Sequence, residues 1–220
     1  MPYAKTVILI RHGQTPSNLT GSIQGPDEPL TDLGRDQAEK LANRLARSPR
    51  LYPLKAILTS SFARAKETAL IIGDRFPGVA VVPSMVYHEC LHPSRIRGLP
   101  INDPEVVRTL GEFTKNFHNP EYSYEDGETF SQRKARALIA LSQLEDHYGD
   151  CIALVTHGVF ATHIINCILH GEQLTSYMLE RAPMMFPNTG ILKLTFGEYH
   201  TFSGKRTGWR IHPGDASHLE

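Results

Sequence analysis

The chain has 220 residues, of which 40% are hydrophobic and 21% are charged, and its 23 basic side chains balance its 23 acidic ones. That length is typical of one sizeable domain with its own core, and zero net charge gives no electrostatic footprint for nucleic acid or an anionic membrane. Because the three cysteines are widely spaced and no apolar stretch approaches the length of a membrane helix, we expect a cytoplasmic protein without disulfides.

The first half of the chain alternates strand and helix patterns. An apolar run that ends at Arg11 predicts a buried strand, and an apolar stripe after Thr31 and Asp32, either of which can act as the cap, predicts the first long helix. The predicted elements are strands over residues 6–11, 55–60 and 79–83 and helices over residues 32–48 and 61–76.

The second half begins with an irregular segment rich in Pro, Gly, His and Arg, residues 84–127. Within it we expect one helix, from Pro104 to about Phe117. Gly197 and Gly204 separate the last two strands and suggest a hairpin. The elements predicted after the irregular segment are a helix over residues 128–148, a strand over 151–156, a helix from 158 to about 170, and strands near 189–196 and 208–212.

Strands separated by helices predict an α/β protein with a mostly parallel sheet covered on both faces, a three-layer αβα arrangement. The final hairpin adds an antiparallel edge strand to this sheet. We expect a single domain over residues 1–220, in which the segment of about 84–127 is an insertion that covers the substrate.

Two apolar strands of this sheet end in the same dipeptide, His-Gly. His12 follows one of them and His157 the other. In an open α/β sheet, ligands bind outside the carboxyl ends of the strands, so both histidines are expected at one edge. Arg11 and Arg64 are predicted to reach the same edge, and arginine clusters suit phosphate because the planar guanidinium donates bidentate hydrogen bonds. The helix that begins after Gly158 adds backbone donors for an anion.

Such a site favours phosphoryl transfer. A neutral histidine between arginines can attack phosphorus while the arginines spread the charge of the transferring group. The leaving oxygen then needs a proton, and Glu89 is the best-placed acid, with Glu28 as its rival. His88 and His92, at i and i+4, invite a metal interpretation, but Pro in the same segment argues against a helix there, and we expect neither a metal nor a cofactor.

The motifs "LIRHGQTPSN", "QGPDEPLTDLGRDQA", "TSSFARAKETA" and "LVTHG" resemble the histidine phosphatase superfamily, in the branch that includes cofactor-dependent phosphoglycerate mutases. The weaker echoes "DGETF", "NTGI" and "GDASHL" extend the resemblance over nearly the whole chain. It implies a phosphoglycerate mutase-like fold, a phosphohistidine on His12 and proton donation by Glu89. The residues that it implies for the phosphate pocket are Arg11, Asn18, Gln24, Gly25, Arg64, His157 and Gly158.

The resemblance favours a phosphatase over a mutase. A mutase of this family usually carries Trp where Ser17 stands, and an aromatic and basic insert between the motifs of Arg64 and Glu89 that is absent here. We therefore expect a metal-independent phosphomonoesterase of the histidine acid phosphatase type. Phosphoglycerate mutase-type transfer and a phospho-ligand-binding protein without turnover remain the alternatives.

The surroundings of this site leave two roles open. Arg95 and Arg97 either recognise a second anionic group of the substrate or are plain surface charges. Asp126 and Glu128 are interpreted as charges at the start of the following helix rather than as catalysts. The expected partner is a small phosphorylated molecule, and a homodimer is left open.

Overall fold

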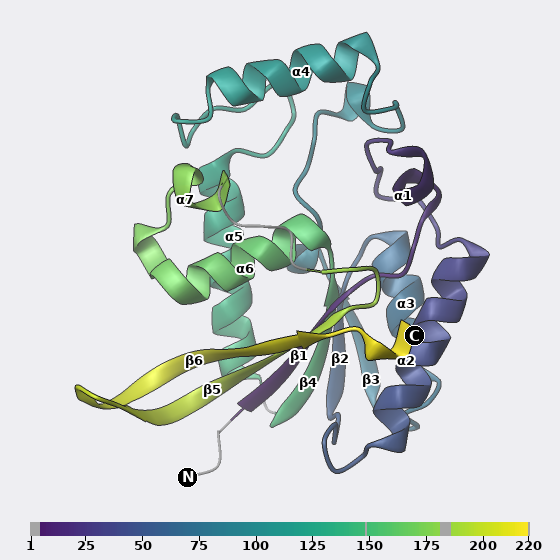
Figure 1. Cartoon of the computed structure of the whole chain (residues 1–220), viewed down its shortest axis with the longest axis vertical. Helices are drawn as coiled ribbons and strands as arrows, with labels where there is room; N and C mark the ends of the chain where they lie inside the picture. Colours follow the sequence, from purple (N-terminus) through teal and green to yellow (C-terminus); the bar gives the residue numbers. More distant parts are fainter. Residues whose placement is uncertain (1–4, 148, 181–185, 220) are drawn as a thin grey trace.

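A six-stranded sheet with the order β3-β2-β4-β1-β5-β6 forms the centre of the protein (Figure 1). The computed structural model describes residues 5–147, 149–180 and 186–219. The strands are β1 (Lys5–Arg11), β2 (Ala56–Ser60), β3 (Ala80–Ser84), β4 (Cys151–Thr156), β5 (Ile191–Thr201) and β6 (Gly204–Asp215). The first four pair in parallel, whereas β5 pairs antiparallel with β1 and β6 antiparallel with β5. The expected mostly parallel sheet with an antiparallel edge is confirmed, and the two antiparallel pairings, β1 with β5 and β5 with β6, lie at one side.

The helices agree with the predicted pattern except for the two shortest. They are α1 (Pro16–Thr20), α2 (Asp32–Arg47), α3 (Ala63–Gly73), α4 (Pro104–Lys115), α5 (Phe130–Asp146), α6 (Gly158–His170) and α7 (Ser176–Glu180). The α1 and α7 helices escape prediction because five residues do not complete an apolar repeat. Thr31 is the cap of α2, since its side chain accepts a hydrogen bond from the backbone N–H of Gly34. None of the helices described is both long and apolar enough to cross a membrane.

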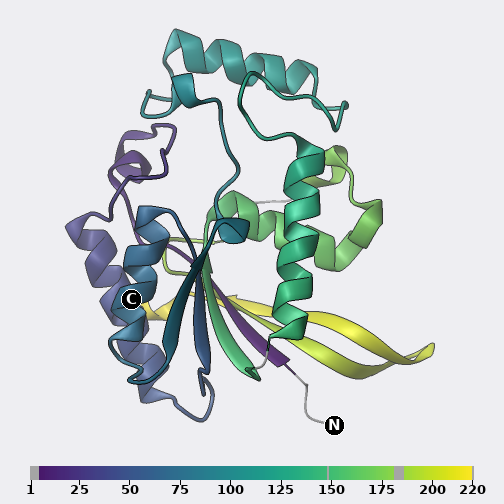
Figure 2. The same cartoon turned by 180° about the vertical axis from the view of Figure 1, so that it is seen from behind.

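Two helical layers cover the sheet, α2 and α3 on one face and α5 and α6 on the other (Figure 1, Figure 2). The strand β1 serves both layers, because successive side chains point to opposite faces. Ile8 and Ile10 pack with α2 and α3, and Val7 and Leu9 pack with α5 and α6. The apolar run before Arg11 is therefore buried on both sides, as the three-layer prediction requires.

The C-terminal hairpin is longer than predicted. Gly197 was expected between the strands, but it pairs with Gly208 inside the ladder, and the turn comes only after Thr201. Pairs such as Tyr199 with Arg206 continue the ladder past the glycine. A glycine weakens a strand but does not end it when the flanking residues still pair across the strands.

Residues 85–127 lie beyond the carboxyl ends of the parallel strands, with α4 across them (Figure 2). The predicted helix from Pro104 is thus confirmed, and it ends two residues early, at Lys115. Ile23, from the loop after α1, packs in a small apolar cluster with Ile96 and Val106 of this segment. The loop after α1 and the segment 85–127 therefore share one local core above the sheet.

Candidate active site

His12 follows β1 directly and is buried at the carboxyl edge of the sheet. Its Nδ1 lies 2.7 Å from the carbonyl oxygen of Gly13, and its Nε2 lies 3.1 Å from Nε of Arg64. A carbonyl only accepts a hydrogen bond and a guanidinium only donates one, so the proton is on Nδ1 and the lone pair on Nε2. The fold thus holds a neutral imidazole in a single tautomer.

Arg64 lies in the first turn of α3, as predicted, and only 1% of it is exposed. Its Nη1 donates a hydrogen bond of 2.7 Å to the carbonyl oxygen of Gly25. Burial lowers the pKa of Arg64 to about 10, a shift that the nearby carboxylate of Glu89 opposes. The guanidinium is still charged at neutral pH and provides a fixed positive charge beside Nε2 of His12.

His157 reaches the same edge from the end of β4, and its ring centroid lies 5.1 Å from that of His12. Its Nε2 lies 2.8 Å from Oγ of Ser60, while its buried Nδ1 has no hydrogen-bond partner among the described residues. Burial, and then the charge of Arg64, lowers the pKa of both His12 and His157 well below the ordinary value. Both rings are therefore neutral at pH 7.

Arg11 is the second cation of the site. Its Nη1 donates to the carbonyl oxygen of Phe186 at 2.8 Å, and its buried Nε is unpartnered within the part of the chain described. Burial lowers the pKa of Arg11, and the charge of Glu89 opposes this shift. This N–H of the Arg11 guanidinium, unpaired among the described residues, is a free donor in the buried site, and it suits an anionic ligand.

Glu89 caps the N-terminus of α6 with its side chain. Its Oε1 accepts from the backbone N–H groups of Cys90 and Phe160, at 2.8 and 2.9 Å, and its Oε2 accepts from that of Val159 at 3.2 Å. The rival, Glu28, instead accepts from the backbone N–H of Ser17 at 2.6 Å. Glu89 therefore sits beside the histidines, at the helix terminus that follows His157.

A pocket of about 200 Å³ opens beside His12, Arg11 and Glu89. Of the predicted site residues, those that line it are Arg11, His12, Asn18, Gln24, Glu89 and Gly158. Arg64 and Gly25 do not line the pocket, but Arg64 contacts both His12 and Gly25. His157 lies against His12 without lining the pocket. Glu28 is not among the lining residues, so the geometry favours Glu89 as the pocket carboxylate.

Sequence reasoning missed part of the pocket wall. The additional lining residues are Ser22, Ile23, Cys90, His92 and Val159. It also missed a clamp on the far side of His12, where Nδ2 of Asn188 donates to the carbonyl oxygen of His12 at 3.0 Å and to Oδ1 of Asn18 at 3.1 Å. The backbone N–H of Thr189 reaches the same carbonyl at 3.2 Å. The motif "NTGI" was the available signal for this clamp, but the sequence assigned it no role.

Arg95 and Arg97 have partners outside the pocket. The guanidinium of Arg95 lies 4.9 Å from the ring centroid of Tyr124, and its Nε is 3.1 Å from Oε2 of Glu125. Nε of Arg97 donates to the carbonyl oxygen of His92 at 2.9 Å. Neither arginine lines the pocket. Both hold the segment 85–127 together, so the geometry favours neither as the reader of a second anionic group.

Asp126 and Glu128 do not form a charge pair at the start of a helix, because α5 begins at Phe130 with Thr129 as its cap. Asp126 accepts from the backbone N–H of Ser94 at 2.8 Å. Glu128 forms a bidentate ion pair with Arg136, at 2.7 and 2.8 Å. Both carboxylates lie in the loop and hold neighbouring chain segments in place.

The metal interpretation of His88 and His92 has no structural counterpart. Nδ1 of His88 lies 2.6 Å from the carbonyl oxygen of Glu89, and the ring stacks on Phe62 with centroids 5.4 Å apart. Across residues 5–147, 149–180 and 186–219, no three His, Cys, Asp or Glu side chains are grouped as metal ligands. His92 instead contributes to the pocket wall.

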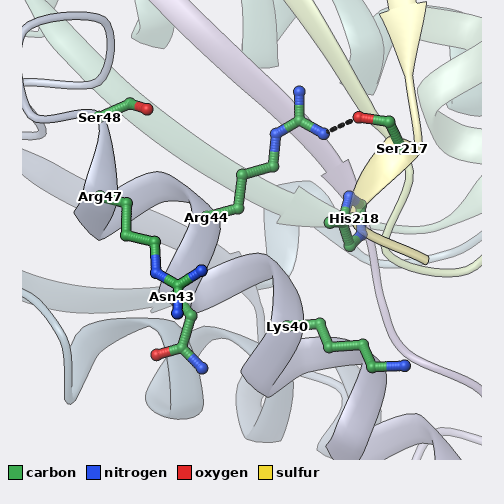
Figure 3. Close-up of a pocket in the computed structure, with 7 residues that line it drawn as sticks. All are labelled: Lys40, Asn43, Arg44, Arg47, Ser48, Ser217 and His218. Carbon is green, nitrogen blue, oxygen red and sulfur yellow. Dashed lines mark hydrogen bonds between the residues drawn. The ribbon is translucent and has the colours of Figure 1, made fainter. Parts of the chain in front are cut away.

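A larger hollow of about 490 Å³ lies between α2 and the C-terminal turn Ser217–Leu219 (Figure 3). It is lined by basic side chains, but they are largely engaged: Arg44 pairs with Asp215 and reaches toward Ser217, and Nε2 of His218 lies 3.0 Å from Oγ1 of Thr189. In Figure 3 the side chain of Arg47 extends away from the contact between Arg44 and Ser217. The contacts around this hollow therefore hold the C-terminal turn against α2. The candidate catalytic residues lie at the smaller pocket.

Comparison with known proteins agrees with the motifs. Phosphoglycerate mutase-like protein 4 of Arabidopsis thaliana is 28% identical, over 97% of this chain and 86% of the relative. The metal-independent phosphoserine phosphatase of the same plant is 33% identical, over 69% of this chain and 63% of the relative. The structure of Bacillus stearothermophilus YhfR is 26% identical, with a TM-score of 0.73 over 99% of this chain and 100% of that one. The model of the histidine phosphatase superfamily, branch 1, matches residues 7–205, and the chain belongs to this superfamily.

Proposed function

We propose that the protein hydrolyses small phosphomonoesters through a phosphohistidine on Nε2 of His12. The observation that carries the proposal is the tautomer of His12, which places a lone pair on Nε2 beside a buried guanidinium. The lone pair forms the N–P bond as the P–O bond to the leaving group breaks. Water then attacks phosphorus, the P–N bond breaks, and inorganic phosphate leaves.

Charge stabilisation comes from the side chains around Nε2. Arg11, Arg64 and His157 surround the transferring phosphoryl group, and Arg64 exchanges its hydrogen bond to His12 for one to a phosphoryl oxygen as the N–P bond forms. Asn18 and Gln24 line the same pocket as neutral donors. The backbone N–H groups at the N-terminus of α6, which begins at Gly158, add further donors for the phosphoryl oxygens.

Glu89 is the proton donor in this proposal. Among the residues that the structure describes, its Oε2 accepts one hydrogen bond, from Val159, so this oxygen has room for a proton to be passed to the leaving oxygen. After the first step the same carboxylate takes a proton from the attacking water. The pocket that it shares with His12 is the support for this role.

The substrate is proposed to carry one phosphate. The rest of the pocket wall is neutral or weakly basic, with Ser22, Ile23 and His92 among its members. Mutase-type transfer is the second candidate, because one relative is named as phosphoglycerate mutase-like and another as a phosphoserine phosphatase. The short connection of α3 and β3 between Arg64 and Glu89 favours the phosphatase.

The test is an assay with p-nitrophenyl phosphate in excess EDTA, followed by rapid acid-free quenching of the wild type. We expect turnover, an acid-labile and base-stable phosphoryl group on the protein, and loss of both in His12→Ala. A panel of phosphorylated metabolites then separates release of inorganic phosphate from isomerisation. Phosphate on a serine, or full activity of His12→Ala, would refute the proposal.

The setting of the enzyme is also part of the proposal. We take residues 1–220 as one catalytic unit in which the segment of about 84–127 covers the substrate. A reducing compartment such as the cytoplasm is supported by the free, buried thiols of Cys90, Cys151 and Cys167. Light scattering on the purified protein decides between a monomer and a homodimer.

A further inference from the structure

The proton donor lies in a segment with little regular structure. We call residues 86–91 the acid segment; it follows β3, and only its first two residues belong to a short 3-10 turn, Met85–Tyr87. Its carbonyl groups are held by side chains of other elements. Those of Val86 and His88 accept from Nη1 of Arg136 at 3.1 and 2.6 Å, and that of Tyr87 accepts from Oγ1 of Thr156 at 2.7 Å.

Arg136 is itself immobilised from two sides. Its Nε and Nη2 donate to the two carboxylate oxygens of Glu128, at 2.8 and 2.7 Å, and only 12% and 9% of the two side chains are exposed. Its guanidinium also lies 4.0 Å from the ring centroid of Phe160, whose backbone N–H donates to Glu89. Arg136 therefore touches the acid segment and the helix end that receives the Glu89 carboxylate.

Glu128 secures the other end of the acid segment. Its Oε2 accepts from the backbone N–H of Leu91 at 3.3 Å, and its own backbone N–H donates to the carbonyl oxygen of Leu91 at 2.9 Å. The ion pair thus binds the chain before and after Glu89. A buried ion pair is an expensive way to gain stability, because desolvation offsets the attraction. In this ion pair, Arg136 also donates to the carbonyl groups before Glu89, and Glu128 also accepts from the backbone N–H of Leu91 after it.

We propose that Arg136 and Glu128 are positioning residues that set the Glu89 carboxyl in place for proton transfer. The inference rests on the proposed function, in which Glu89 protonates the leaving oxygen. Neither residue lines the pocket, so both act through the acid segment. Substitution of either residue should therefore slow the reaction most on substrates whose leaving group needs protonation.

The test compares two substrates in Arg136→Lys. Lysine keeps the charge, but a single ammonium cannot hold a carboxylate fork and two carbonyls together. We expect kcat/KM, which reports the step that releases the leaving group, to fall on the order of ten-fold more on an alkyl phosphate than on p-nitrophenyl phosphate, whose leaving group needs little protonation. In a Glu89→Gln background the same change should bring no further substrate-selective loss, because the acid that it positions is gone.

Two further variants keep the test decisive. Glu128→Gln keeps the side-chain shape and the backbone link to Leu91, and it should show the same selectivity more weakly. Leu144→Ala, in the buried part of the same helix, is the control that lowers the melting temperature without touching the acid segment. Equal losses on both substrates in folded Arg136→Lys and Glu128→Gln, or a selective loss in Leu144→Ala, overturn the inference. A wild type that hydrolyses neither ester refutes the proposed function instead.

Discussion

Gly34, in the first turn of α2, packs against the backbone of Gln14, two residues after His12. A Cβ at Gly34 would lie 2.1 Å from the carbonyl oxygen of Gln14, and a Cβ at Gly13 would lie 2.4 Å from the carbonyl oxygen of Gly34. The loop after the candidate nucleophile and the start of α2 therefore touch backbone to backbone. This contact requires glycine for space rather than for an unusual backbone angle.

Gly34→Ala should displace the loop that follows His12. We expect a loss of about 1–3 kcal/mol in the free energy of unfolding, as for other overpacked sites, together with a lower kcat. Gly111→Ala, inside α4 with open space around it, is the control and should be neutral or stabilising by up to about 1 kcal/mol. Denaturant unfolding and the phosphatase assay measure both; similar behaviour of the two variants would contradict the prediction.

Glu89→Gln should affect substrates unequally. Removing the proton donor should lower kcat/KM on an alkyl phosphate on the order of a hundred-fold or more, and clearly less on p-nitrophenyl phosphate. Steady-state kinetics on the two esters provides the measurement. Glu28→Gln is the matched control: if it shows the leaving-group dependence and Glu89→Gln does not, the acid lies in the earlier loop.

Chelation should leave the activity unchanged. In the proposed mechanism the charge of the phosphoryl group is met by the guanidinium groups of Arg11 and Arg64, with His157 as a neutral neighbour, so no metal ion is needed. The measurement is the rate on p-nitrophenyl phosphate after dialysis against EDTA, with and without added Mg²⁺ or Zn²⁺. Activity that disappears with EDTA and returns with either ion would show that this account of the site is wrong.

Acid should destabilise the protein through its buried histidines. Burial lowers the pKa of His163 to about 4, so between there and its ordinary value near 6.5 the unfolded chain binds one more proton. The stability that this residue allows at neutral pH is therefore lost as the pH falls through that window. In His163→Leu the slope of stability against pH should decrease by roughly 1.4 kcal/mol per unit.

Denaturant unfolding from pH 4.5 to 7.5 tests this slope. Ile164→Val is the control, because it removes a buried methyl group next to His163 without changing a titratable group. An unchanged slope in His163→Leu, or an equal change in Ile164→Val, would rule out His163 as the source.

The positions of the candidate catalytic histidines and of Arg64 were predictable because the geometry of a parallel sheet determines them. Once His12 and His157 are assigned to the ends of parallel strands, their meeting follows from the parallel arrangement, and Arg64 follows from the helix after the neighbouring strand. The apolar runs of the central strands are too short for a helix and are bounded by polar residues, which favours buried strands.

The rest depended on contacts that no short pattern contains. Ile23 reaches the pocket wall because Ser22 bridges to Pro100, nearly 80 residues later in the chain. Glu128 and Arg136 are eight residues apart with only the latter inside α5, so the pair does not match the spacing of a helical ion pair. Gly197 was interpreted as part of a turn because its sequence neighbours do not show that it pairs with Gly208 on the following strand.

The small cluster of Ile23, Ile96 and Val106 has a consequence for altering the enzyme. It fastens the loop after α1 to the segment 85–127, whereas His12, His157, Arg11 and Arg64 are anchored in the sheet and its helices. Glu89 lies where these two parts meet, at the start of the segment. If the segment covers the substrate as proposed, a chimaera that takes a new substrate would have to exchange residues 21–24 and 91–126 as a matched set, and it would have to keep Glu128 and Arg136 so that Glu89 stays in place.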